Sequence, residues 1–82
     1  MATEQIGDYE IDYTGMHLPE SDGWAAWVEI FGPSANPMHR QAVFPSQRVA
    51  IETSFPTEQE AERAARQIAL EMIEHRHRNK PA

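Results

Sequence analysis

The composition of the chain is that of one small folded domain. Its 82 residues include 40% hydrophobic residues, a balance typical of a globular protein rather than a disordered one. Cysteine is absent, which excludes disulfides and thiolate zinc sites. No apolar run is long enough to cross a membrane, and the N-terminus has no basic and apolar signal region. We therefore expect a single cytoplasmic domain over residues 1–82 with no membrane association.

The negative charge is concentrated near the N-terminus. Residues 1–22 hold six acidic residues and no Lys or Arg, whereas residues 23–82 hold seven acidic and seven basic residues. The whole net charge of −6 therefore lies in the first 22 residues. Two interpretations stay open: a solvated strand and loop, or an acidic surface that attracts a basic partner.

The N-terminal part of the chain is expected to combine a loose end with one strand. Residues 1–7 are expected to be a flexible N-terminus. Tyr9, Ile11 and Tyr13 alternate with polar residues, which predicts a strand that is buried on one face. Gly15 is expected to break it, and the next three residues either continue it after a bulge or pair separately.

Residues 24–31 have the strongest strand pattern in the chain. One face carries small and branched apolar residues, and the other carries Trp27 and Phe31, so neither face is cleanly polar. If a helix covers the first face, Trp27 and Phe31 lie on the other, near Val43 or Phe44. Because aromatic residues commonly anchor interfaces, we take Trp27, Phe31 and Val43 as a candidate interaction face. Alternatively, the N-terminal hairpin covers that face, or Trp27 lies half-buried at a twisted edge.

Two further strands are expected before the end of the chain. Residues 32–37 contain two prolines and predict a loop. Residues 38–44 predict the returning strand of a hairpin, Pro45 a break, and residues 48–53 another strand.

Residues 57–78 predict one long amphipathic helix. Thr57 and Glu60 have the spacing of a capping box, and acidic residues at the start and basic residues at the end suit the helix dipole. Apolar residues recur at helical spacing at Ala61, Ala64, Ala65, Ile68, Ala69, Met72 and Ile73. Residues 79–82 are expected to be a flexible C-terminus. The fold class is therefore α+β: an antiparallel sheet of three to four strands packed against one long C-terminal helix.

The sequence lacks the residue patterns typical of catalysis. No serine lies in a Gly-x-Ser-x-Gly motif. Asp8, Glu10 and Asp12 share one strand face, but so short a chain offers few walls for a cleft that would raise a carboxyl pKa. The same residues do not form a calcium loop, because Tyr13 and Pro19 stand where Gly and Glu are required. We expect no enzyme activity and no cofactor.

The end of the predicted helix is basic. The residues of this basic end are His75, Arg76, His77, Arg78 and Lys80. Such an end could contact phosphate, so weak nucleic-acid binding is the alternative function, although the net negative charge argues against it. Only Glu71 and His75 share a side of the helix as potential metal ligands, and we expect solvated side chains there rather than a metal site. A sheet followed by a helix resembles the double-stranded RNA-binding domain, but the first helix of that family is missing, and residues 58–60 are Glu-Gln-Glu where that family has a lysine cluster.

Two segments carry a resemblance to other proteins. Residues 48–65 read as a strand, a Phe-bearing turn and an Ala-rich helix that opens with acidic residues. Together with residues 24–31, they resemble the small uncharacterised α+β proteins common in bacterial genomes and their prophages. The resemblance covers about half of the chain and implies an accessory or assembly protein without catalysis. We therefore expect a small interaction protein that acts through a protein partner or through self-association.

Overall fold

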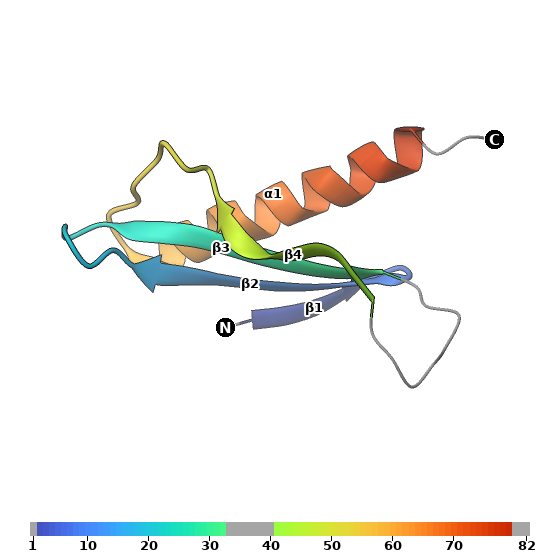
Figure 1. The fold of residues 1–82 in the computed structure, drawn as a ribbon, viewed down its shortest axis with the longest axis horizontal. Coiled ribbons are helices and arrows are strands. Elements are labelled where there is room, and N and C mark those ends of the chain that lie inside the picture. Colours follow the sequence, from blue (N-terminus) through green and yellow to red (C-terminus); the bar gives the residue numbers. More distant parts are fainter. Residues whose placement is uncertain (1, 33–40, 80–82) are drawn as a thin grey trace.

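The computed structural model confirms the α+β fold: four strands form one sheet, and a single helix packs against it (Figure 1). The structure describes residues 2–32 and 41–79, with the side chains of residues 41 and 77–79 left out. The elements are β1 (Ala2–Ile6), β2 (Tyr9–His17), β3 (Trp24–Gly32), β4 (Gln41–Val49) and α1 (Glu58–Asn79). The strand order is β1-β2-β3-β4, and every neighbouring pair is antiparallel.

The N-terminal segment differs from the expectation of a loose end, because Ala2–Ile6 forms the edge strand β1. A two-residue turn at Gly7 and Asp8 joins it to β2, and Ile6 lies opposite Tyr9. Gly7 has a φ of 59°, a conformation that glycine adopts without a steric penalty. β1 pairs without interruption from Ile6 to Ala2. The pattern of five residues alone could not reveal this pairing, because so short a strand is stable only when it pairs with the rest of a sheet.

Two strand boundaries also differ from the prediction. β2 continues through Gly15, where a Cβ atom would lie 2.6 Å from the carbonyl oxygen of Glu58, so glycine permits α1 to approach the sheet. β4 continues through Pro45, because an edge strand can tolerate a residue without an N–H group. The strand expected at residues 48–53 is wrong beyond Val49, since Ala50 has a φ of 50° and opens a turn.

The helix starts and packs as its sequence predicts. Thr57 Oγ1 accepts a hydrogen bond of 3.1 Å from the backbone amide of Glu60, as expected for an N-cap. α1 lies across β2 and β3, and its alanines Ala61, Ala65 and Ala69 are completely buried. We call the side of the sheet that faces α1 the inner face. Its core residues are Ile11, Ala26, Val28, Ile30 and Val49.

Candidate interaction face on the outer side of the sheet

The face turned away from α1, here called the outer face, carries the residues that the core does not use. Strand alternation sends the side chains of residues 26, 28 and 30 of β3 inward and those of residues 27, 29 and 31 outward. The register then assigns the outer-face residues of the other strands. Among the described residues, the outer face includes Thr3, Gln5, Glu10, Asp12, Thr14, Met16, Trp27, Glu29, Phe31, Ala42, Ser46 and Arg48.

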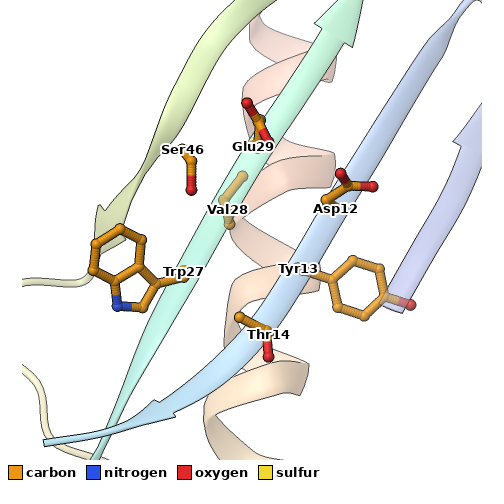
Figure 2. Close-up of a pocket in the computed structure, with 7 residues that line it drawn as sticks. All are labelled: Asp12, Tyr13, Thr14, Trp27, Val28, Glu29 and Ser46. Carbon is orange, nitrogen blue, oxygen red and sulfur yellow. The ribbon is translucent and has the colours of Figure 1, made fainter. Parts of the chain in front are cut away.

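Two carboxylates lie directly opposite each other on this face. Asp12 of β2 pairs with Glu29 of β3, and their side chains project on the same side of the two strands (Figure 2). The hydroxyl of Thr3 donates a 2.8 Å hydrogen bond to Asp12 Oδ1. No cation among the described residues forms an ion pair with Glu29. Like charges directly opposite each other destabilise a sheet, so this pair works against the stability of the fold.

Trp27 lies next to this carboxylate pair. It stands between Thr14 and Arg48 in the cross-strand register and is half-buried. The hollow lined by Trp27, Asp12, Glu29 and Ser46 (Figure 2) has a volume of only about 20 Å³, close to the space that one water molecule needs. Pockets for small molecules are usually at least about 300 Å³. The outer face is therefore a shallow surface at this point, and its shape suits a protein better than a small ligand.

Arg48 is the single basic residue among the described outer-face side chains. Its Nη2 donates a 3.3 Å hydrogen bond to the carbonyl oxygen of Thr53. Its Nε is buried and has no acceptor among the described residues. Since Arg48 is directed to the loop after β4, it leaves the Asp12–Glu29 pair without a neutralising partner on the described outer face.

The structure separates the three residues of the predicted interaction face. Trp27 and Phe31 lie on the outer face, as expected, and both are half-buried. The prediction for Val43 is wrong. Register irregularities in β4 place Ala42 opposite Phe31. Val43 instead packs against the core. Its Cγ1 and the ring of Tyr9 both lie close to where a side chain at Gly32 would begin, with Cγ1 2.7 Å from that position. A β-bulge of this kind changes which side chains share a face.

A second group of polar residues ties β1 to the helix on the inner side. Arg66 donates to both carboxylate oxygens of Glu4, with Nε–Oε1 and Nη2–Oε2 distances of 2.8 and 3.0 Å. The Tyr13 hydroxyl donates to Glu4 Oε1 at 3.1 Å. The Arg66 hydrogen bonds hold the pKa of the Glu4 carboxyl below its ordinary value of 4.5. Burial raises the pKa of the Tyr13 phenol above 10.0, and the hydrogen bond to Glu4 raises it further.

The predicted basic end is only partly described. His75 and Arg76 are exposed near the end of α1, whereas the side chains of His77 and Arg78 and the whole of Lys80 lie outside the described residues. Within residues 2–32 and 41–79, no three His, Asp or Glu side chains gather closely enough to hold a metal ion. The helix in this part of the chain is not apolar enough to span a membrane.

Comparisons with protein-family models, with curated proteins and with solved structures give no match for the chain.

The sequence identified the aromatic part of the outer face but missed its acidic part. Asp12 and Glu29 are 17 positions apart, and the alternating patterns put each on the polar side of its own strand without placing one opposite the other. A hairpin alignment of residues 9–17 with residues 24–32 would have supplied that signal.

Proposed function

We propose that the protein is a small, non-enzymatic interaction module whose outer face binds a basic segment of another protein. The observation that carries the proposal is the Asp12–Glu29 pair beside Trp27. A lysine or arginine of the partner would remove the repulsion between the two carboxylates, and an apolar side chain next to it would cover Trp27.

A second copy of the chain is a poorer occupant of this face. Two outer faces stacked on each other would bring together two Asp12–Glu29 pairs, and the only described base on each face is Arg48, which is bound to Thr53. Like charges across an interface disfavour a complex. Charge complementarity therefore favours a basic partner of different sequence.

The test is a selection of peptides from a random displayed library with the full chain as bait. The account expects enrichment of peptides that combine Lys or Arg with aliphatic or aromatic residues. Their affinity should fall at least about tenfold for Trp27→Ser, since interface aromatics commonly contribute more than 1 kcal/mol. Ile51→Ser is the matched control, because Ile51 is 69% exposed and does not belong to the outer face. Equal binding by the Trp27 variant, or selected peptides without basic residues, would contradict the proposal.

The competing function, weak nucleic-acid binding by the basic end, makes a different prediction for the same protein. It rests on the exposure of His75 and Arg76. Retention on DNA that decreases steeply with salt and is lost on removal of residues 75–82 would favour it. The Trp27→Ser variant would then bind DNA as well as the wild type does.

A further inference from the structure

The two edges of the sheet differ in how well they are protected against pairing with another strand. β4 contains Pro45 and two register irregularities, both of which interrupt the row of backbone groups that a further strand would need. β1 contains no proline, lysine or arginine, its one charged residue is Glu4, which is paired with Arg66, and its register with β2 is regular over all five residues. Among the described residues, no strand pairs with the free edge of β1, the edge opposite β2.

The turn before β2 defines which backbone groups of β1 bond to β2 and which point to the free edge of the sheet. In a two-residue hairpin turn the carbonyl of the first flanking residue accepts from the amide of the second, so Ile6 and Tyr9 form a hydrogen-bonded pair. The pairs alternate along an antiparallel ladder. Glu4 and Ala2 therefore also bond to β2 through their backbone groups. The backbone amide and carbonyl groups of Thr3 and Gln5 are left pointing to the free edge.

β1 is held in place on both of its faces. Thr3 bonds to Asp12 on the outer face, and Glu4 bonds to Tyr13 and Arg66 on the inner face. A strand that is already ordered loses little conformational entropy when another strand pairs with it. The edge thus has neither a proline nor a bulge, its one charged side chain is already paired with Arg66, and the strand is preorganised.

We propose that a second copy of the chain pairs with this edge, β1 against β1 in antiparallel orientation, so that the two sheets join into one of eight strands. In the register that uses all of these free backbone groups, Thr3 of one copy pairs with Gln5 of the other. The two-fold axis then passes between the two Glu4 residues, which lie opposite each other. Such a contact is isologous, as in most homodimers. This inference does not rest on the proposed function of the outer face.

The inner side leaves room for the two helices of this dimer. Strands lie about 4.8 Å apart and α1 lies over β2 and β3, so the two helix axes would be about 19 Å apart. A helix with its side chains is about 10–12 Å across, so a gap of about 8 Å would remain above the paired β1 strands. In one copy, this side already has a groove of about 320 Å³ lined by Tyr13, Gln59, Glu62, Arg63 and Arg66.

The charges around this gap do not oppose a second copy. Each copy contributes the acids Glu4 and Glu62 and the bases Arg63 and Arg66, so its contribution is neutral. The two Glu4 carboxylates meet near the axis, but each is bound by the Arg66 of its own chain through two hydrogen bonds. The edge dimer therefore avoids the accumulation of negative charge that disfavours stacking of the outer faces. β1 is only about 17 Å long, so the dimer is expected to be weak.

The test is sedimentation equilibrium of the full chain from micromolar to millimolar concentrations, combined with NMR spectra of the backbone amides over the same range. The account expects a monomer–dimer equilibrium with concentration-dependent shifts at the amides of Thr3 and Gln5. Gln5→Pro removes an outward N–H from both copies and should raise the dissociation constant about tenfold, the effect of losing two hydrogen bonds. Circular dichroism checks that the variant is folded.

A pair of charge variants keeps the proposal testable if Gln5→Pro does not fold. The double variant Thr3→Lys, Gln5→Lys would place lysines opposite each other across the two-fold axis and should abolish the dimer. The matched control, Gln47→Lys with Thr53→Lys, adds the same charge to exposed positions of β4 and the turn after it, away from the Asp12–Glu29 pair, and should dimerise like the wild type. A monomer at every concentration, a dimer whose shifts occur at Trp27 instead of β1, or equal dimerisation of all variants would overturn the proposal.

Discussion

The inner and outer faces of the same sheet differ in burial and in the placement of charge. The inner face buries Ile11, Val28 and Ile30 almost completely under α1, and no charged residue is buried among the described residues. The outer face holds the opposed carboxylates of Asp12 and Glu29 next to a half-buried Trp27. Selection for stability alone would remove a like-charged cross-strand pair. The difference supports the proposal that the inner face supplies the stability and that the outer face is available for binding.

The largest expected effect comes from truncating the inner face. Ile30→Ala should lower the free energy of unfolding by about 2–5 kcal/mol, because it removes buried apolar atoms and leaves a cavity. Urea titration followed by tryptophan fluorescence measures the loss. The matched variant on the outer face is Met16→Ala, which should change the stability by less than about 0.5 kcal/mol, since Met16 is 47% exposed. Equal losses for the two variants would remove the distinction between the faces.

A smaller effect of opposite sign is expected from the carboxylate pair. Glu29→Gln keeps the size of the side chain but removes the repulsion with Asp12, so it should raise the free energy of unfolding by about 0.2–1 kcal/mol. The same variant should bind the selected basic peptides more weakly than the wild type does. A variant that is less stable than the wild type would show that Glu29 supports the fold. A variant that binds the peptides as tightly as the wild type would show that the acidic pair does not contribute to binding.

The smallest effect is a change in the pH dependence of stability, arising on the inner side. The pKa of Glu4 is lowered in the folded protein because Arg66 bonds to its charged form. Its contribution is therefore complete above the unfolded value of about 4.5 and is lost as the pH falls through the lower folded value. Glu4→Gln should be less stable than the wild type at neutral pH, and the difference should shrink in acid. Urea titrations between neutral pH and pH 3 measure it, with Glu52→Gln, an exposed residue of the turn after β4, as the control. A difference that stays constant with pH would contradict this role of the ion pair.

The features that could be predicted from the sequence are those that one segment determines by itself. Thr57 and the helical spacing of the alanines defined α1, and the alternation of Tyr9, Ile11 and Tyr13 identified the inner side of β2. Pro45 was misleading, because proline ends a central strand but is tolerated at the edge where β4 lies.

The features that could not be predicted depend on pairing between segments. β1 is a strand because it pairs with β2. Val43 points to the inner face because β4 contains a bulge. Asp12 lies opposite Glu29 only because of the register between β2 and β3. The Glu4–Arg66 pair joins residues 62 positions apart. Patterns within a single segment do not contain this information.

The most direct measurement of the central claim combines binding and stability in one variant, Trp27→Ser. Its affinity for a selected basic peptide and its free energy of unfolding are measured on the same preparation, with Ile30→Ala as the reference for a loss on the inner face. The account predicts that Trp27→Ser loses most of the binding but less unfolding free energy than Ile30→Ala loses. A variant that binds like the wild type, or that is destabilised as strongly as Ile30→Ala, would show that Trp27 belongs to the folded core rather than to a binding surface.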